Sequence, residues 1–237
     1  MNSNLFFFRL YSLAENAKPT FIGNAFPIAP NGKFLTCRHV VQAVPEGARL
    51  ALFDNLSQKM IEIPSSPQLP SKEAVDLALL TVPVANSYFL PILSPMKLRV
   101  GEDAYTYGYF AIGGDSNQIE NGYFAGKIVN FSNANDASVA AITLPFASIE
   151  GLSGSPVLTY HNGVKLVGMI IGNRTSRVLA SEVQAYKDDK VEFRETVNRI
   201  VEFGIAYHAA SIVNFLAEVG LVGHVVADGR VELAGLE

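Results

Sequence analysis

Short apolar segments, each bounded by turn-forming residues, recur along most of the chain. Their side chains are enriched in branched and aromatic residues, which suit the pleated surface of a β-sheet. This pattern predicts an all-β protein with many short strands. The predicted strands lie within residues 4–13, 20–29, 33–41, 49–53, 60–63, 75–82, 101–109, 122–129, 137–144, 156–159, 165–172 and 203–207.

Two segments depart from this strand pattern. Residues 209–219 carry apolar side chains at helical spacing, which predicts an amphipathic helix that follows the last long strand. Residues 173–202 form the most charged stretch, and we interpret them as a solvated insertion between two strands. The alternative is that this insertion is a lid or docking surface that controls access to a site. Beyond residue 220, two apolar runs about Asp228 and Gly229 predict a small hairpin.

Composition narrows the class of protein. Of the 237 residues, 49% are hydrophobic and 17% are charged, which favours a well-packed globular protein over a disordered chain. The formal net charge of -4 gives no electrostatic reason to expect a nucleic acid or an anionic membrane as partner. No apolar run reaches the length that a transmembrane helix needs.

Cys37 is the single cysteine, so no intramolecular disulfide can form. Together with the lack of a recognisable secretory leader, this predicts a protein of a reducing compartment such as the cytoplasm. The four histidines and the cysteine are scattered along the chain without the spacing of a metal site. We therefore expect neither a metal nor a cofactor.

Residues 150–157, which read Glu-Gly-Leu-Ser-Gly-Ser-Pro-Val, carry the clearest chemical motif. Glycines on both sides of Ser153 let the backbone approach a substrate and turn its N–H groups inward. If Ser153 is a nucleophile, the N–H groups of Gly151 and Ser153 can both point at a developing oxyanion. A serine needs a base, and the base needs an orienting group. The loop therefore predicts a histidine and a carboxylate elsewhere in the chain.

Two earlier segments supply these groups. His39 comes at the end of the predicted strand 33–41, where a rigid scaffold would hold it. Asp76 opens the apolar segment 75–82, and a carboxylate beside such a strand is costly to bury unless it is hydrogen-bonded. Taken alone, the two residues have ordinary explanations as a core histidine and a strand-end cap. Taken with Ser153, they follow the chain order of the chymotrypsin triad.

These motifs resemble the trypsin-like serine peptidases of the chymotrypsin fold, in particular bacterial stand-alone and HtrA-like peptidase domains. Residues 36–40 match a strand end of the form Thr-x-x-His-Val, and residues 76–80 match Asp-Leu-Ala-Leu-Leu. Residues 151–156 match Gly-x-Ser-Gly-x-Pro. Three motifs in this order are far more specific than any one of them. Weaker similarities extend the resemblance from about residue 20 to about residue 216.

The resemblance implies two six-stranded antiparallel β-barrels with a C-terminal helix and a site in the cleft between them. The first barrel would occupy residues 1–95, and the second, with the insertion 173–202, residues 96–219. Residues 220–237 would be a tail, and the whole would form one peptidase domain. His39 would be the general base, Asp76 its orienting group and Ser153 the nucleophile, with the N–H groups of Gly151 and Ser153 as the oxyanion hole.

The resemblance also locates the pocket for the substrate's primary side chain. No aspartate stands where trypsin carries one, so we expect a preference for small or apolar side chains. Leu152 replaces the aspartate that zymogen-type members use to bind a freed N-terminus, which argues against activation by N-terminal cleavage. The pocket would be flanked by Ala147, Ser148 and Glu150 on one side and by Ile171, Gly172 and Asn173 on the other, with Gly204 or Tyr207 at its back.

The resemblance therefore predicts a serine endopeptidase that acts on a peptide or protein substrate through an acyl-enzyme intermediate. Uncontrolled proteolysis is hazardous, so we also expect a narrow target or a regulatory protein partner. A hypothesis of a different class is a catalytically silent module of the peptidase fold, whose cleft binds a peptide or protein partner without cutting it. A third is an esterase that uses the same triad.

Overall fold

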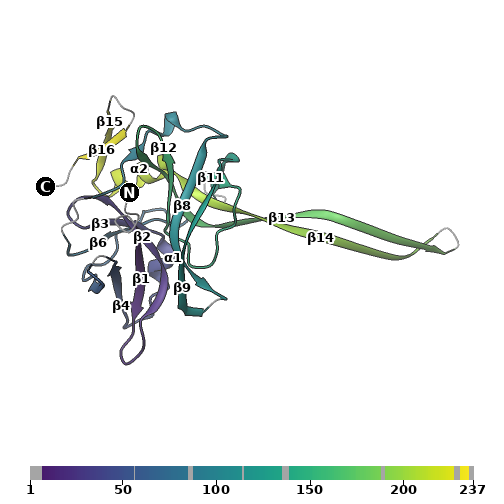
Figure 1. The fold of residues 1–237 in the computed structure, drawn as a ribbon, viewed down its shortest axis with the longest axis horizontal. Coiled ribbons are helices and arrows are strands. Elements are labelled where there is room, and N and C mark those ends of the chain that lie inside the picture. Colours follow the sequence, from purple (N-terminus) through teal and green to yellow (C-terminus); the bar gives the residue numbers. More distant parts are fainter. Residues whose placement is uncertain are drawn as a thin grey trace.

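The computed structural model describes residues 7–55, 57–84, 88–113, 115–134, 139–187, 190–226 and 230–234. Within them the chain consists mainly of antiparallel strands, with a helix near its C-terminal end, as the all-β prediction required (Figure 1). Residues 4–6 and 137–138 of the predicted strands lie outside the described residues, as do Asp228 and Gly229 of the predicted hairpin.

The first sheet contains six strands in the order β5-β4-β1-β2-β3-β6. Its hairpin between β2 and β3 turns at Asn31 and Gly32, whose φ angles of 57° and 72° favour asparagine and glycine. A Cβ at Gly32 would lie 1.9 Å from the carbonyl oxygen of Val82, so glycine is required there. The strands are β1 (Phe8–Leu13), β2 (Thr20–Ala29), β3 (Lys33–Thr36), β4 (Arg49–Asp54), β5 (Lys59–Glu62) and β6 (Ala78–Thr81).

The second sheet contains ten strands, and its main path runs in the order β10-β11-β14-β13-β12-β8-β9. β16 pairs with β15 and with β7, and β7 pairs in parallel with β13, so the hairpin predicted near the end of the chain joins this sheet. A 3-10 turn, η2 (Pro95–Lys97), follows β7. The strands are β7 (Ile92–Leu93), β8 (Asp103–Ile112), β9 (Asp115–Lys127), β10 (Asn130–Ala134), β11 (Val139–Leu144), β12 (Pro156–Tyr160), β13 (Val164–Lys187), β14 (Lys190–His208), β15 (Val222–Val225) and β16 (Arg230–Ala234).

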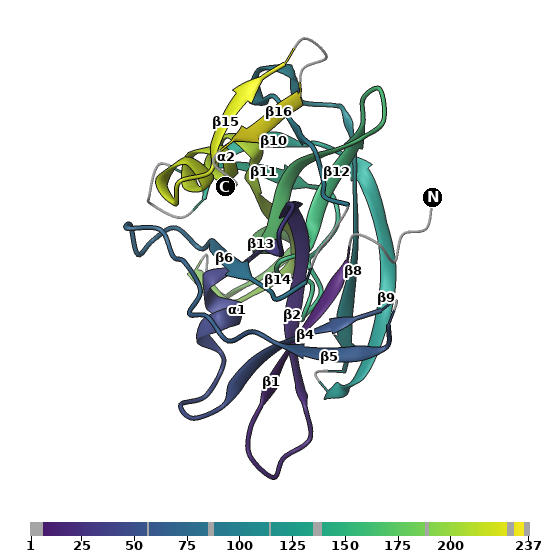
Figure 2. The same ribbon diagram turned by 90° about the vertical axis from the view of Figure 1, so that its left-hand side faces the viewer.

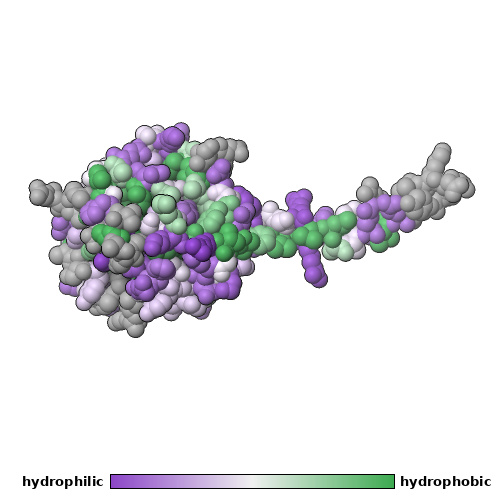
Figure 3. Space-filling view, turned by 90° about the horizontal axis from the view of Figure 1, so that it is seen from above, coloured by the Kyte–Doolittle hydropathy of each residue, from purple (hydrophilic) through white to green (hydrophobic). Residues whose placement is uncertain are grey.

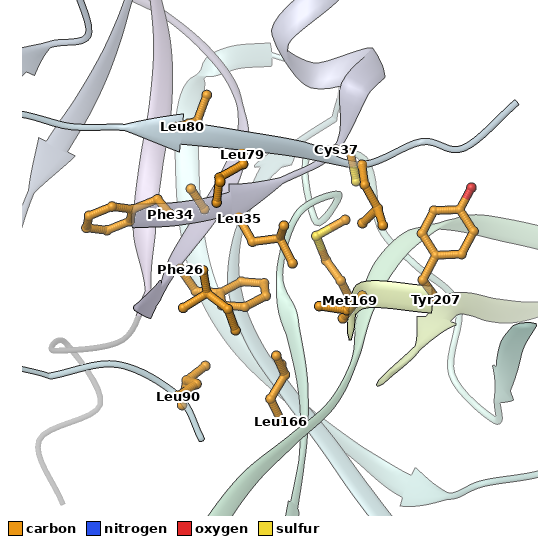
Figure 4. Close-up of a cluster of buried hydrophobic side chains, with 14 of the residues drawn as sticks. Phe26, Phe34, Leu35, Cys37, Leu79, Leu80, Leu90, Leu166, Met169 and Tyr207 are labelled. Carbon is orange, nitrogen blue, oxygen red and sulfur yellow. The ribbon is translucent and has the colours of Figure 1, made fainter. Parts of the chain in front are cut away.

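One apolar core joins the two sheets. Phe26 and Leu35 of the first sheet belong to the same buried cluster as Met169 and Tyr207 of the second (Figure 4). All four side chains are fully buried. Because burying one large apolar side chain stabilises a fold by about 1.5–3 kcal/mol, this shared cluster holds the two sheets in a fixed relation. Residues at the sheet boundary are therefore well placed to form a site.

Two helices accompany the sheets in the described part of the chain. Helix α2 (Ala209–Glu218) confirms the predicted helix and buries Ile212, Phe215 and Leu216. Helix α1 (Arg38–Gln42) replaces the second half of the strand predicted over residues 33–41, so that prediction is wrong beyond Thr36. An apolar run of this length suits a strand or a short helix equally well. His39 therefore lies in the first turn of a helix and not at the end of a strand.

β13 and β14 continue far beyond the second sheet as a two-stranded ribbon, which we call the arm (residues 173–187 and 190–203; Figure 1). The arm contains the segment predicted to be a solvated insertion. The side chains that the structure describes in this segment (residues 173–184, 193 and 195–202) are exposed, but the segment is a regular extension of two strands and not an excursion between them. The central Asp188 and Asp189 lie outside the described residues.

The view along the arm shows α2 and the hairpin of β15 and β16 at the top of the body, with β1, β4 and β5 of the first sheet in its lower part (Figure 2). The arm thus leaves the body from the second sheet alone. Among the described residues, no helix is both long enough and apolar enough to cross a membrane.

Candidate active site

His39 and Asp76 lie side by side where α1 meets the loop before β6. The His39 Nδ1 is 2.6 Å from the Asp76 Oδ2, and the backbone N–H of His39 donates to Asp76 Oδ1 at 2.8 Å. The carboxylate therefore holds both the ring and the backbone of the histidine. With Nδ1 protonated toward the carboxylate, Nε2 is left as a proton acceptor. The His39 side chain is 48% exposed, so a substrate can reach it.

Two residues that sequence reasoning did not assign to catalysis hold Asp76 in place. The Tyr207 hydroxyl accepts a hydrogen bond from the Asp76 backbone N–H at 2.8 Å. Burial raises the pKa of the Tyr207 phenol, so this hydroxyl stays neutral. The Arg38 guanidinium donates to the carbonyl oxygens of Pro70 at 2.6 Å and Glu73 at 2.7 Å, which ties α1 to the loop before Asp76. Tyr207, expected at the back of the pocket, therefore lies behind the His39–Asp76 pair.

The loop that carries Ser153 is anchored to both sheets. The Ser153 carbonyl accepts from the backbone N–H of Asn24 in β2 at 2.9 Å, and the Gly154 N–H donates to the Ile170 carbonyl in β13 at 3.0 Å. The thiol of Cys37, two residues before His39, donates to the same Ile170 oxygen at 3.2 Å. The segments that carry His39 and Ser153 thus meet at one carbonyl group.

The Asn24 side chain is the main connection that sequence reasoning missed. It is 1% exposed, and its Nδ2 donates to the carbonyls of Gly151 at 2.7 Å and Tyr109 at 2.9 Å. Its Oδ1 accepts from the Tyr109 N–H at 2.8 Å. One buried amide therefore joins the first sheet, the second sheet and the Ser153 loop. Its signal in the sequence was a polar residue within the apolar strand 20–29.

Two glycines with positive φ angles determine the backbone conformation of the Ser153 loop. Gly151 and Gly154 have φ angles of 91° and 84°, which favour glycine. A Cβ at Gly154 would lie 2.1 Å from the Asn24 carbonyl oxygen, so a larger residue does not fit. In the described part of the chain, the N–H groups of Gly151 and Ser153 donate to no protein acceptor, and no hydrogen bond joins the Ser153 hydroxyl to His39. The two N–H groups are those assigned to the oxyanion hole.

The two expected walls of the substrate pocket are joined directly. The Asn173 Oδ1 accepts from the Ser148 N–H at 2.5 Å, and the Asn173 Nδ2 donates to the Ser148 carbonyl at 2.8 Å. Ala147 is half-buried next to Ser148, and Glu150 is exposed. The Glu150 carbonyl accepts from the Ala111 N–H at 3.1 Å, which fixes this wall to β8.

The other members of the expected pocket lie on the strands that lead into the arm. Ile171 and Gly172 are half-buried on β13. Gly204 on β14 is paired with Asn173, and its N–H donates to the Phe146 carbonyl at 2.6 Å. His208 caps α2 by accepting from the Ala210 N–H at 3.1 Å, and burial lowers its pKa. It acts there as a neutral helix cap.

Cys37, His39 and Asp76 form a group that could in principle hold a metal ion, because their ligand atoms all lie within 4.8 Å of one another. No ligand spacing in the sequence indicated this group, because the fold brings its members together. Burial, reinforced by the nearby negative Asp76, raises the pKa of the Cys37 thiol well above its ordinary value. That thiol donates to the Ile170 carbonyl, and the Asp76 carboxylate binds His39 Nδ1, so each potential ligand already has a partner within the protein. The chemistry of this donor set therefore fits a histidine–carboxylate pair better than a metal site.

The His39–Asp76 pair lies beside the first sheet and the glycine-flanked Ser153 lies on a loop of the second, an arrangement that is typical of the chymotrypsin-type peptidase fold. Residues 23–169 match the family model of the trypsin-like peptidase domain. The chain belongs to this family of trypsin-like peptidases. No curated protein sequence matches the chain.

Solved structures share the fold. Rv3671c from M. tuberculosis H37Rv, in the inactive form of a serine-to-alanine mutant, is 18% identical with a TM-score of 0.58, covering 92% of this chain and 89% of that one. The HtrA-type protease AlgW with a decapeptide is 14% identical with a TM-score of 0.60, covering 94% of this chain and 70% of AlgW. An AlgW mutant with a tripeptide is also 14% identical with a TM-score of 0.60, and 66% of its length is covered. The likeness confirms the two-barrel chymotrypsin fold.

Proposed function

We propose that the protein is a serine endopeptidase in which His39, Asp76 and Ser153 form the catalytic triad. The observation that carries the proposal is the Asp76 carboxylate, which binds both the ring and the backbone N–H of His39 beside the loop of Ser153. Membership of the trypsin-like peptidase family supports the same function. The division into barrels at residues 1–95 and 96–219 belongs to this proposal, since it places the three groups on the two sides of a cleft.

In the proposed mechanism, His39 Nε2 takes the hydroxyl proton of Ser153 while the serine oxygen attacks the carbonyl carbon of the substrate. The oxyanion that forms accepts hydrogen bonds from the N–H groups of Gly151 and Ser153. The C–N bond then breaks, and His39 gives its proton to the leaving amine. Water, deprotonated by His39, hydrolyses the acyl-enzyme and restores Ser153. Asp76 holds the imidazole tautomer and stabilises its cation throughout.

A peptide is the substrate class that the comparisons favour, because AlgW is described with a decapeptide and a tripeptide in its structures. We propose that Ala147, Ser148, Glu150, Ile171, Gly172 and Asn173 flank the substrate's primary side chain. The half-buried Ala147 leaves room for a small or apolar group. The buried thiol of Cys37 suits a reducing compartment, which supports a cytoplasmic location, and control by a regulatory protein remains part of the proposal.

Two observations favour a second candidate, a silent module that binds a peptide without cutting it. The Ser153 hydroxyl makes no hydrogen bond to His39 within the described residues, and the Ser148–Asn173 hydrogen bonds join the pocket walls. The first observation is common in substrate-free enzymes, because catalytic hydrogen bonds often tighten only in the substrate complex. We therefore retain the endopeptidase as the leading proposal.

Labelling with a fluorophosphonate separates the two candidates. We expect the wild-type protein to be labelled at Ser153, and Ser153→Ala to lose both labelling and cleavage of a peptide library by about 1,000-fold or more. Ser155→Ala is the matched control, because this buried neighbour is assigned no role in the reaction. A wild-type protein that binds peptides but is neither labelled nor able to cleave them would establish the silent module instead.

A further inference from the structure

The arm has no second layer in the described part of the structure. Beyond the pair of Asn173 with Gly204, its two strands pair only with each other. At the root, the Arg174 guanidinium donates to the Asn133 carbonyl at 3.3 Å. At about 3.3 Å per residue, β13 extends roughly 45 Å past this root. An isolated two-stranded ribbon is marginally stable in water, so a ribbon of this length is expected to pack against something else.

The two faces of the arm differ in character. Directly paired residues of an antiparallel ribbon share a face, and successive residues alternate between faces. One face, which we call the apolar face, carries most of the large apolar side chains: Val178, Val183, Phe193, Val197, Val201 and Phe203. The opposite face, which we call the polar face, carries Thr175, Arg177, Leu179, Glu182, Gln184, Thr196, Asn198, Ile200 and Glu202.

A bulge keeps the apolar face continuous. The register shifts between Leu179 and Ser181, so one extra residue enters β13 there. Without that shift, Val183 would lie on the face opposite Val178. Val178, Val183 and Phe193 are 51%, 54% and 52% exposed. Hydrophobic side chains run along the arm in the space-filling view (Figure 3). A stripe of this length marks an interaction surface.

Two charges on the apolar face are arranged so that its central part complements itself, while a third, Arg174, lies at the root and donates to Asn133. Glu195 and Arg199 lie on β14 at equal distances on either side of Val197. About 13 Å of strand separates them, which is too far for an ion pair within one chain. A two-fold axis through Val197 would bring Glu195 of one copy opposite Arg199 of the other, and the reverse. The same axis would bring Phe193 opposite Val201. Two-fold contacts require this kind of self-complementary surface.

We propose that two copies of this chain associate through their arms. The apolar faces pack against each other with β14 antiparallel to β14 of the second copy, about a two-fold axis at Val197. This arrangement covers the apolar stripe in both copies and neutralises Glu195 and Arg199. The two bodies then lie at opposite ends of the paired arms, so neither active site is covered by the contact. Dimerisation can therefore be measured without reference to peptide cleavage.

Charge exchange tests the proposal by sedimentation velocity over a range of protein concentrations. We expect the wild type to be a dimer. Glu195→Arg and Arg199→Glu should each weaken dimerisation by at least tenfold, because like charges then face each other. The double variant Glu195→Arg/Arg199→Glu should dimerise again. An equimolar mixture of the two single variants should form a heterodimer, since one copy then presents two arginines and the other two glutamates.

Matched controls lie on the polar face, where Arg177→Glu and Glu202→Arg make comparable charge changes and should leave the dimer intact. Circular dichroism on every variant shows whether the fold is retained. A monomeric wild type at all concentrations would overturn the proposal and point to a different protein as the partner of the arm. It would also be overturned if the double variant and the mixture failed to dimerise, or if the controls weakened the dimer as much. None of these readouts depends on peptide cleavage.

Discussion

The surroundings of Ser153 and the arm are both built on antiparallel strands, but they are stabilised in different ways. Around Ser153, the Asn24 amide is 1% exposed and connects three segments from both sheets. In the arm, Val183 and Phe193 are more than half exposed, and cross-strand pairing is the main contact. Contacts within one chain are therefore enough to stabilise the body. The arm gains comparable burial only when a second surface covers it.

Core truncation should show the largest difference between the two regions. We expect Phe26→Ala to lower the free energy of unfolding by about 3–5 kcal/mol, because it opens a cavity in the core shared by both sheets. The matched change Phe193→Ala, made in the dimer-breaking background Arg199→Glu, should cost less than about 0.5 kcal/mol. Urea unfolding measures both. Equal losses would show that the arm is packed within its own chain.

Removing the buried amide should have the next largest effect. We expect Asn24→Ala to destabilise the fold by about 2–3 kcal/mol, because it leaves the buried carbonyls of Gly151 and Tyr109 without their donor. It should also lower peptide cleavage, since the Ser153 loop loses its anchor. Asn198→Ala on the polar face of the arm is the control, and it should change neither quantity. Unchanged cleavage by a folded Asn24→Ala protein would contradict the positioning role.

Removing the Tyr207 hydroxyl, which accepts from the Asp76 backbone N–H, should have a smaller effect, mainly on catalysis. We expect Tyr207→Phe to destabilise by about 1 kcal/mol and to lower kcat more than it raises KM, because Asp76 loses the partner of its backbone N–H. Tyr160→Phe, at a position 77% exposed, serves as the control. A change in KM alone would place the effect in substrate binding and not in the orientation of Asp76.

The smallest effect should appear on acidification. Burial lowers the pKa of His208 in the folded state, so the unfolded chain binds this proton more readily. The stability that depends on neutral His208 is present above pH 6.5 and is lost as the pH falls through that value toward the lower folded pKa. We expect His208→Asn, which keeps an N-cap acceptor, to lose less stability between pH 7 and pH 5 than the wild type. An identical loss in both would contradict this assignment.

Local patterns were enough to predict much of the body. β2 matches the predicted bounds, because Pro30 and the turn-forming Asn31-Gly32 pair follow the apolar run. Helix α1 was missed because its apolar residues fit either type of element, and the Arg38 contacts that hold it reach residues more than thirty positions away. The arm was taken for an irregular insertion. Its bulge near Ala180 interrupts the two-residue alternation, so that the charges dominate the pattern.

For the candidate site, the sequence was enough to propose the residues with distinctive chemistry, but it did not indicate the residues that position them. His39, Asp76 and Ser153 stand in short motifs, whereas Asn24 and Tyr207 act through single contacts that exist only after the sheets have packed. The resemblance offered Gly204 or Tyr207 for the back of the pocket, but it did not predict the hydrogen bond between Tyr207 and Asp76. A polar residue within an apolar segment indicates that a hydrogen-bond partner is needed. The identity of that partner depends on the tertiary fold.

The position of Asn173 has a mechanical consequence. This residue stands at the root of the arm, on the same uninterrupted strand, and its amide grips both the N–H and the carbonyl of Ser148. The arm is therefore connected through Asn173 to Ser148, which belongs to the proposed wall of the substrate pocket. Because these hydrogen bonds join the arm to Ser148, a tilt of the arm would be transmitted to the Ser148 wall of the proposed pocket.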